Sequence, residues 1–393
     1  MDKKIIYADN AATTKPDERV VAAMEPYFGY YANPSQPYSF SRKAKKAIKE
    51  ARETIAESIN ARPDEIFFTS GGTEGDNYGI KMPVFEALKD GKDNIGIITA
   101  EFEHHAVLHS VDFLSETFPQ VRASLLKPGS DGIVRPEELK RVFSEMKECG
   151  ITPAVVSVML VNNELGTIQP VEELCKITKE AFPSAVFHTD AVQAMPHMTV
   201  DVRKLGVDIL TASAHKYNGP KGTGFMYIRK GSIGQPFVHG GGQESGMRAG
   251  TENTAGIVGT AEALRLACLE MADRNNRVRE VEKAFFEELD RKFVDYIVNG
   301  DDGSGETRVS GTISLSLPGM SGEKILHRLD LMGISVSTGS ACNGSSDEIS
   351  HVLKSIGLEP AVAMGTIRIS FGHENTIEEA VQVAGAIAKI MNI

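Results

Sequence analysis

A lysine that follows a predicted strand is the residue best suited to covalent chemistry. Lys216 comes soon after the apolar run Ile209–Ala212 and stands next to His215, with Ser213 and several glycines close by in the sequence. A lysine amine becomes nucleophilic when partial removal from water helps it to lose its proton, and such a strand end provides that setting. When Lys216 is considered alone, an exposed lysine at a strand exit is the favoured interpretation.

Polar residues also follow the other predicted strands. Gly72 and Thr73 lie where a strand passes into a helix, and such a helix start presents backbone N–H groups to a phosphate. His104, Asn163 and Asp190 follow three further strands. Each of these residues also has a purely structural interpretation. The glycines could form a tight turn, the histidine could be a hydrogen-bonded structural residue and Asp190 could be a helix N-cap. Because ligands bind at the carboxyl ends of strands in open α/β sheets, we expect these residues to lie together.

Taken together, these residues fit the requirements of pyridoxal phosphate. Lys216 would carry the aldehyde, Asp190 would keep the pyridine nitrogen protonated, and donors at the glycine turn would hold the phosphate. A coincidence of suitable residues at every strand end is improbable. The glycine run at 240–242 does not match G-x-x-x-x-G-K-S/T, which disfavours a nucleoside triphosphate site.

The elements that must position these residues form an alternating pattern. From about Ile66 to Tyr227, short apolar runs alternate with helical stretches, which predicts a large α/β unit around a mostly parallel sheet. A long helical pattern over Thr254–Tyr296 then leads into a smaller α+β domain. The predicted strands of the large unit are Glu65–Thr69, Asn94–Thr99, Ala154–Val161, Ala185–His188, Ile209–Ala212 and Gly224–Ile228. We predict a large domain of residues 12–255 and a small domain of residues 1–11 and 256–393.

Composition excludes several other classes of protein. The chain has 393 residues, of which 41% are hydrophobic and 24% are charged, as is typical of globular proteins. Its net charge of −11 argues against general binding to nucleic acid or to anionic membranes. No apolar stretch is long enough to span a bilayer and the N-terminus does not resemble a signal peptide, so we expect a cytoplasmic protein. The four cysteines have neither metal-ligand nor disulfide spacing, and no metal site is predicted.

Four motifs follow the strands in a characteristic order. They are Ser70-Gly71-Gly72-Thr73-Glu74, Asn162-Asn163-Glu164-Leu165-Gly166, His188-Thr189-Asp190-Ala191-Val192-Gln193 and Ser213-Ala214-His215-Lys216. They resemble the motifs of the cysteine desulfurases, within the class V aminotransferase branch of the fold-type I pyridoxal-phosphate enzymes. The resemblance covers nearly the whole chain. It implies a large domain with a mostly parallel seven-stranded sheet and a smaller α+β domain that carries a catalytic cysteine loop.

The resemblance also implies roles for individual residues. Lys216 would bind the cofactor covalently, Asp190 would pair with the pyridine nitrogen and His104 would stack on the ring. Asn163 and Gln193 would contact the oxygen side of the ring. The phosphate would be held by Gly72, Thr73, Ser213 and His215, joined by Thr251 of a neighbouring subunit. A homodimer with a shared active site is therefore implied.

A cysteine in a loop rich in glycine and serine separates a desulfurase from an ordinary aminotransferase. Cys342 lies in such a loop, which suits a nucleophile better than a packing residue. It resembles the persulfide-forming cysteine of the long-loop desulfurases. Cys175 and Cys268 lie within helical patterns, where we expect small buried hydrophobic residues, and Cys149 has no supporting motif.

The implied reaction transfers sulfur from L-cysteine to Cys342 and releases L-alanine. Arg368 resembles the arginine that holds the substrate carboxylate, Asn33 is expected to bind substrate, and His104 is expected to exchange a proton with the substrate thiol because a histidine pKa lies near working pH. A protein scaffold or carrier, for iron–sulfur cluster assembly or thiolation, would accept the sulfur from Cys342.

Two departures from the family pattern leave alternatives open. The run Gln36-Pro37-Tyr38 replaces a usual histidine by tyrosine, and the chain stops soon after its last helix, so substrate preference and sulfur acceptor are not determined. One alternative is a class V aminotransferase or selenocysteine lyase acting on another small amino acid. A catalytically silent scaffold or regulatory protein is the non-enzymatic alternative, against which the intact Lys216 and Asp190 argue.

Overall fold

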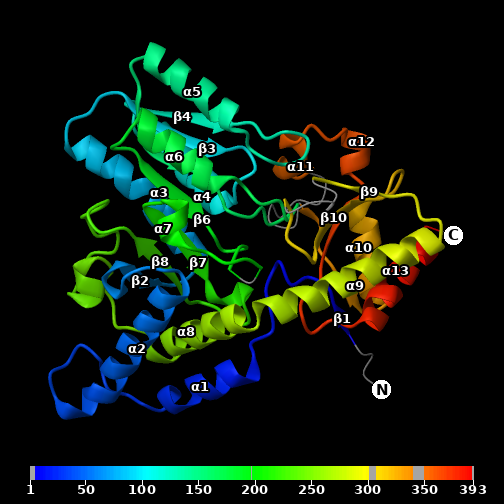
Figure 1. Cartoon of the computed structure of the whole chain (residues 1–393), viewed down its shortest axis with the longest axis horizontal. Helices are drawn as coiled ribbons and strands as arrows, with labels where there is room; N and C mark the ends of the chain where they lie inside the picture. Colours follow the sequence, from blue (N-terminus) through cyan, green and yellow to red (C-terminus); the bar gives the residue numbers. More distant parts are fainter. Residues whose placement is uncertain (1–4, 196, 301–306, 340–348, 392–393) are drawn as a thin grey trace.

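A seven-stranded sheet forms the centre of the large domain in the computed structural model (Figure 1), which describes residues 5–195, 197–300, 307–339 and 349–391. The strand order is β2-β8-β7-β6-β5-β3-β4, and β8 is antiparallel to both of its neighbours while the other neighbouring pairs are parallel. The strands are β2 (Ile66–Thr69), β3 (Ile95–Ala100), β4 (Val121–Leu126), β5 (Thr152–Ser157), β6 (Val186–Asp190), β7 (Ile209–Ser213) and β8 (Gly224–Ile228). The predicted fold class is confirmed.

Helices cover both faces of this sheet because its strands are apolar on both sides. In β3, Ile97 packs with α3 and α4 on one face, and the next residue, Ile98, packs in the larger core on the other face, as the alternation of side chains along a strand requires. The helices of this domain are α1 (Glu18–Phe28), α2 (Arg42–Ser58), α3 (Gly72–Lys89), α4 (His105–Thr117), α5 (Pro136–Glu148), α6 (Val171–Ala181), α7 (Val202–Leu205) and α8 (Thr254–Leu269).

The small domain has its own hydrophobic core. Its antiparallel sheet has the order β12-β10-β9, and a separate parallel pair joins β1 to β11. Phe285, Leu315, Ile369 and Val383 are among the buried residues of this core. The elements are β1 (Ile6–Tyr7), α9 (Met271–Arg291), β9 (Ile297–Val298), β10 (Thr312–Ser316), α10 (Gly322–Leu331), β11 (Ile334–Ser335), β12 (Thr366–Ser370) and α13 (Ile377–Ile390). Two short helices in the same part of the sequence, α11 (His351–Ser355) and α12 (Pro360–Ala363), bury Val352 and Ala363 in the large core.

The six predicted strands of the large unit are all present, but the seventh, β4, was missed. It lies at the edge of the sheet and exposes Arg122 and Ala123, so it lacks the continuous apolar character of the inner strands. The long helical pattern from Thr254 is two helices, because α8 ends at Leu269 and α9 begins at Met271. The helical character predicted for this stretch is therefore present, with a break at Glu270.

These two helices belong to different cores. Ile257 and Leu264 of α8 are buried in the large core, whereas Phe285 and Leu289 of α9 are buried in the small one. In Figure 1 the two yellow-green helices run along one side of the molecule from the large domain to the small domain. The division at residue 255 stays a prediction, and this packing favours a division near Glu270 instead.

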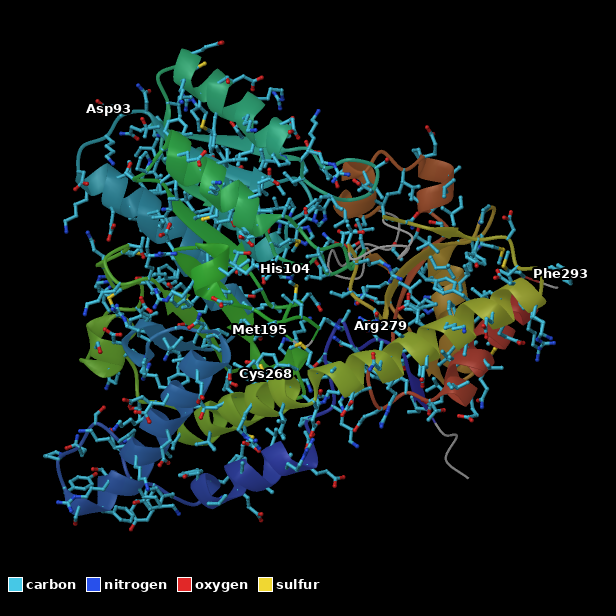
Figure 2. The ribbon with its side chains drawn as sticks, viewed as in Figure 1. Asp93, His104, Met195, Cys268, Arg279 and Phe293 are labelled. Carbon is cyan, nitrogen blue, oxygen red and sulfur yellow. The ribbon has the colours of Figure 1, made fainter. Side chains whose placement is uncertain are left out.

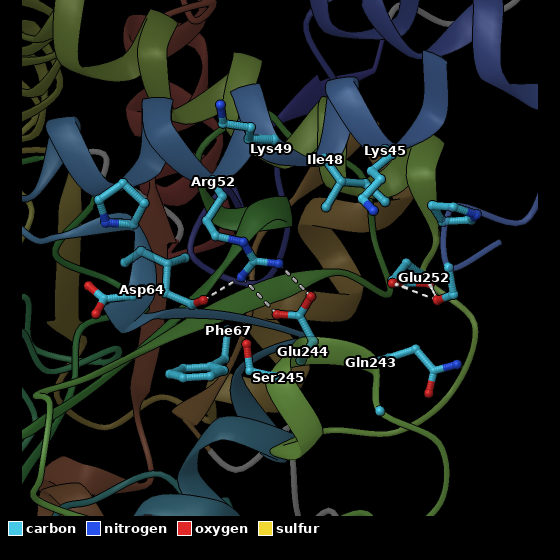
Figure 3. Close-up of a pocket in the computed structure, with 15 residues that line it drawn as sticks. Lys45, Ile48, Lys49, Arg52, Asp64, Phe67, Gln243, Glu244, Ser245 and Glu252 are labelled. Carbon is cyan, nitrogen blue, oxygen red and sulfur yellow. Dashed lines mark hydrogen bonds and ion pairs between the residues drawn. The ribbon is translucent and has the colours of Figure 1, made fainter. Parts of the chain in front are cut away.

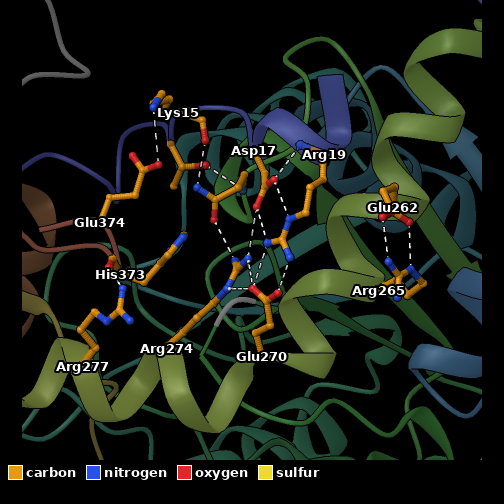
Figure 4. A network of polar contacts seen from close by, with 12 residues as sticks. Lys15, Asp17, Arg19, Glu262, Arg265, Glu270, Arg274, Arg277, His373 and Glu374 are labelled. Atoms are coloured by element: carbon orange, nitrogen blue, oxygen red, sulfur yellow. Dashed lines mark hydrogen bonds and ion pairs between the residues drawn. The ribbon is translucent and has the colours of Figure 1, made fainter. Parts of the chain in front are cut away.

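A network of charged side chains fixes the junction between α8 and α9 (Figure 4). Arg274 donates to Glu270 Oε2 at 2.7 Å and to Asn218 Oδ1 at 3.1 Å, and its side chain lies 3.6 Å from Asp17 Oδ2. Arg19 bridges Asp17 and Glu270. The start of α9 is thereby held to the start of α1. Within the described residues, no helix is both long and apolar enough to cross a membrane.

Candidate active site

Lys216 lies directly after β7, in a short turn of 3-10 helix at residues 214–216. Its Nζ donates to the carbonyl oxygens of Ala11 at 2.6 Å and Ala12 at 2.9 Å, so the amine faces the segment that follows β1. Gln193 Nε2 donates to the same Ala11 oxygen at 2.8 Å. The structure therefore brings Lys216 and Gln193 to one point, although they follow different strands.

Asp190 is buried at the end of β6, next to β7 in the sheet. Burial raises its pKa to about 6, while a hydrogen bond from the Val192 N–H and the nearby charge of Lys216 favour the ionised form. Its Oδ1 accepts that N–H at 2.8 Å, as expected for a turn-capping aspartate. Among the described residues, Oδ2 has no hydrogen-bond partner. Asp190 thus caps the turn with one carboxylate oxygen, and its other oxygen is placed to pair with a cation.

A cavity of about 310 Å³ lies at the start of α3. Its lining includes Gly72, Thr73, Ser213 and His215, the predicted phosphate residues of this chain, together with Lys221. Free N–H groups at a helix start, hydroxyls and a lysine are the donors that a phosphate requires. The residues present therefore fit the phosphate of pyridoxal phosphate.

Close packing explains why glycine occupies position 72. A Cβ atom on Gly72 would lie 2.9 Å from Cγ2 of Val192, the residue whose N–H donates to Asp190. The start of α3 therefore lies against the turn that positions Asp190. Only a residue without a side chain allows this approach.

His104 is the N-cap of α4, and Figure 2 shows it on the side of the large domain that faces the small domain. Its Nδ1 accepts the Ala106 N–H at 3.1 Å, so the neutral ring carries its proton on Nε2. Burial and the charge of Lys216 lower the pKa of His104 to about 4. The expectation of a pKa near working pH is wrong because the ring is desolvated and lies close to a cation.

Arg368 brings the small domain to this edge of the sheet. It lies in β12, and its Nη1 donates to the Asn163 carbonyl oxygen at 3.1 Å while Nη2 donates to Asp9 Oδ1 at 2.9 Å. Its buried Nε has no partner among the described residues. The guanidinium group thus lies beside a predicted cofactor residue and retains a donor that suits a carboxylate.

Comparisons with known proteins agree with this geometry. The family model described as Aminotransferase class-V matches residues 6–383. The protein named cysteine desulfurase IscS from Dictyoglomus turgidum is 44% identical over 378 residues, which cover 96% of this chain and 92% of that protein. The chain belongs to the class V aminotransferase family. This relative and others at similar identity identify it as an enzyme of the cysteine desulfurase group, which depends on pyridoxal phosphate.

Solved structures of this family share the fold. One titled NifS-like protein has a TM-score of 0.88 at 34% identity, covering 99% of this chain and 100% of that chain. Another, titled SspA in complex with cysteine, has a TM-score of 0.78 at 33% identity, covering 93% of this chain and 99% of that chain.

Two residues predicted for the desulfurase site, Asn33 and Thr251, are not among the residues that line the 310 Å³ cavity. Residues close to them in the sequence, Ser35 and Glu252, line a separate cavity of about 540 Å³ (Figure 3). Ser35 Oγ donates to Glu252 Oε2 at 3.3 Å, so the two segments are in contact. Within one chain, the segments that contain Asn33 and Thr251 are therefore in contact, and the roles of these two residues stay predictions.

The cysteines of this desulfurase-family chain differ in exposure. Cys175 is buried in the large core, as predicted. Cys268, labelled on α8 in Figure 2, is exposed, and the prediction of burial is wrong. Its neighbour Ala267 packs in the core, and successive helix residues point in different directions. Cys149 is exposed at the end of α5, and Cys342 lies outside the described residues.

Sequence reasoning missed two residues of the cavity that fits a phosphate. Thr13 and Lys221 line the same cavity as Thr73, and Thr13 Oγ1 lies 3.1 Å from Nδ1 of His215. Burial and the charges of the two neighbouring lysines lower the pKa of His215 to about 4, so this imidazole is neutral. Lys221 had a visible signal, a second lysine in the glycine-rich turn after Lys216, whereas nothing in the sequence distinguishes Thr13.

Proposed function

We propose that this chain removes sulfur from L-cysteine with pyridoxal phosphate as cofactor, releases L-alanine and leaves a persulfide on Cys342. The observation that carries this proposal is the convergence of Lys216, the buried Asp190 and the phosphate cradle at one edge of the sheet. In the reaction, the bond between Cβ and sulfur breaks and a sulfur–sulfur bond forms. The carbon retains the electron pair and takes up a proton, so that L-cysteine and one thiol give L-alanine and one persulfide.

The chain's own groups divide this work. Bound pyridoxal phosphate would supply the electron sink that makes the Cβ–S bond labile. The Lys216 amine would bind its aldehyde and move a proton at Cα of the substrate, and Oδ2 of Asp190 would hold the protonated pyridine nitrogen. Arg368 would orient the substrate carboxylate, with Asn33 as a further predicted substrate contact. The neutral His104 would stack on the ring, and its Nε2–H group would donate a hydrogen bond to the sulfur of the substrate.

We further propose that the active enzyme is a homodimer with shared sites. Thr251 is exposed and lies away from the cavity of its own chain, which supports a role in the site of a second copy. Exposed aromatic residues near α1 support a partner surface, since Phe28 is 68% exposed and Tyr31 is 89% exposed. The sulfur acceptor would be a separate protein scaffold or carrier.

The test compares Cys342→Ala with wild type and with Cys149→Ala, a matched change at an exposed cysteine. Loaded protein is mixed with L-cysteine, and L-alanine, persulfide and the visible absorbance of the cofactor are measured. We expect Cys342→Ala to keep the absorbance change on substrate addition but to lose L-alanine and persulfide formation by orders of magnitude, because no other thiol replaces the nucleophile. Cys149→Ala should behave as wild type.

The same assay separates the alternatives. Near-normal L-alanine formation by Cys342→Ala, without an added thiol, would contradict the desulfurase proposal and favour an aminotransferase or lyase. Failure of the wild type to bind pyridoxal phosphate would refute the whole enzymatic proposal and favour a silent scaffold.

A further inference from the structure

Glu164 is a buried carboxyl group next to Asn163 that the proposed reaction does not use. Its side chain is 5% exposed, which is costly for an acidic residue unless neighbouring groups hold it. Asn162 fixes the turn, because its Oδ1 accepts the N–H groups of Glu164 and Leu165, both at 2.9 Å. The side chain of Glu164 therefore starts from a rigid backbone position.

One oxygen of this carboxyl group contacts two residues of the C-terminal part of the chain. Oε2 of Glu164 accepts a hydrogen bond from Ser350 Oγ at 2.7 Å. A Cβ atom on Gly339 would lie 2.3 Å from the same oxygen, so the Gly339 backbone is packed directly against it. Gly339 precedes and Ser350 follows the part of the sequence that contains Cys342. Glu164 thus contacts one residue before Cys342 and one residue after it in the sequence.

Further contacts hold Ser350 and the helix that it begins, α11. Ser350 is the N-cap of α11 and accepts the Val352 N–H at 3.1 Å. His351 Nε2 donates to the carbonyl oxygen of Glu103, the residue before His104, at 2.9 Å. Val352 packs in the large core, although α11 lies in the C-terminal part of the chain. The start of α11 is therefore tied to the edge of the large sheet that carries the predicted cofactor residues.

The charge of Glu164 is moderated by its surroundings. Burial raises its pKa to about 7, while Ser350 and the charge of Arg368 oppose that increase. In either protonation state a carboxyl oxygen can accept the hydroxyl hydrogen of Ser350. The hydrogen bond therefore does not require a full charge, and a glutamine at this position should preserve it.

We propose that Glu164 is a positioning residue for sulfur transfer. It holds Gly339 and Ser350, which lie on either side of Cys342 in the sequence, against the strand-end site. This proposal rests on the proposed function, because it assigns the transfer step to Cys342.

Two measurements test the proposal on the loaded protein. Amide hydrogen exchange of peptides covering residues 349–356 reports how firmly the start of α11 is held, independently of activity. A single turnover with L-cysteine, followed by alkylation and mass spectrometry of the Cys342 peptide, reports the rate of persulfide formation. The variants are Glu164→Ala, Ser350→Ala and Glu164→Gln. Ser321→Ala is the matched control, since Ser321 caps α10 as Ser350 caps α11.

We expect Glu164→Ala, which loses only the buried hydrogen bond to Ser350, to exchange about tenfold faster at residues 349–356 and to form persulfide about tenfold more slowly. Ser350→Ala also loses the cap on the Val352 N–H, so it should be at least as strongly affected. The concentration of L-cysteine that gives half of the absorbance change should stay as in wild type. Glu164→Gln should restore both measurements, and Ser321→Ala should not differ from wild type. If Glu164→Ala does not fold, Ser350→Ala and Glu164→Gln still carry the test.

Wild-type exchange and persulfide rates in Ser350→Ala would overturn the proposal, as would a Glu164→Gln variant as slow as Ser350→Ala. Equal slowing in Ser321→Ala would also overturn it, because the effect would then come from helix capping in general. A wild-type protein that forms no persulfide on Cys342 would instead refute the proposed function, while the exchange measurement would still report on the contact between Glu164 and Ser350.

Discussion

Asp190→Asn separates the electrostatic role of Asp190 from its role in capping a turn. The asparagine oxygen can still accept the Val192 N–H that Asp190 Oδ1 accepts at 2.8 Å, so the local backbone is preserved. Only the charge is lost. In the cofactor-free protein that charge is unfavourable, because burial raises the pKa of Asp190 from 3.8 to about 6.

The size of the effect follows from this pKa. A shift of about two units corresponds to about 3 kcal/mol at 1.36 kcal/mol per unit. Because the folded-state pKa is the higher one, Asp190 is least unfavourable below pH 4, and stability is lost as the pH rises from 4 through 6. We therefore expect cofactor-free Asp190→Asn to be up to about 3 kcal/mol more stable than wild type at pH 7.5, with little difference at pH 4.

Bound pyridoxal phosphate should make wild type the more stable of the two proteins. A protonated pyridine nitrogen would pair with the aspartate and not with asparagine, so wild type should gain more stability from the cofactor and should form L-alanine much faster. Urea unfolding with and without cofactor, at both pH values, measures these differences. Asp201→Asn, at the half-buried N-cap of α7, is the control and should not stabilise the protein. Equal stabilities of cofactor-free wild type and Asp190→Asn at pH 7.5, with equal gains from cofactor, would refute the reasoning.

Three further predictions concern Lys216, the proposed cofactor lysine, and the junction of α8 and α9. Lys216→Ala should lack the visible absorbance that borohydride abolishes in wild type, and retention of a borohydride-fixed cofactor in this variant would place the attachment elsewhere. Arg274→Ala should lower the free energy of unfolding by about 2 kcal/mol, because it removes the hydrogen bonds of a mostly buried guanidinium group to Glu270 and Asn218, while Arg19 still pairs with Asp17 and Glu270. Arg265→Ala, in an exposed pair, should cost under about 1 kcal/mol, and equal losses in urea unfolding would contradict this. The pKa values of Asp17 and Glu270 are lowered to about 2, chiefly by Arg19, so their pairing stabilises the fold above pH 4.5 and is lost as the pH falls toward 2. Acid titration followed by circular dichroism should show wild type losing this stabilisation and Arg19→Ala losing less of it, and equal losses in the two proteins would contradict the assignment.

The predictable part of the site is the part that follows strands directly. Lys216 and Asp190 each lie next to a buried strand, and the order of strands in a parallel sheet brings their carboxyl ends to one edge. The local sequence was therefore enough to predict where Lys216 and Asp190 lie and which chemical groups they bring there. The edge strand β4 was missed because its exposed residues weaken the apolar signal that reveals inner strands.

The unpredictable part depends on contacts between distant segments. Thr13 meets His215 across 202 positions, and Ser350 meets Glu164 across 186 positions. No local pattern encodes such pairs. The pKa of His104 was also beyond sequence reasoning, because it is set by burial and by the charge of Lys216, which comes from another strand.

The division of labour between the domains determines how the junction acts on function. The residues that line the proposed phosphate cavity all come from the large domain, whereas Arg368 comes from β12 of the small domain and reaches Asn163 across the domain boundary. A change in how the domains meet, such as loss of Arg274 at the start of α9, should therefore displace Arg368, the proposed substrate-binding residue, while leaving the proposed cofactor site in place. Its effect on catalysis should appear as a higher KM for L-cysteine with unchanged affinity for pyridoxal phosphate, because only the first of these depends on both domains.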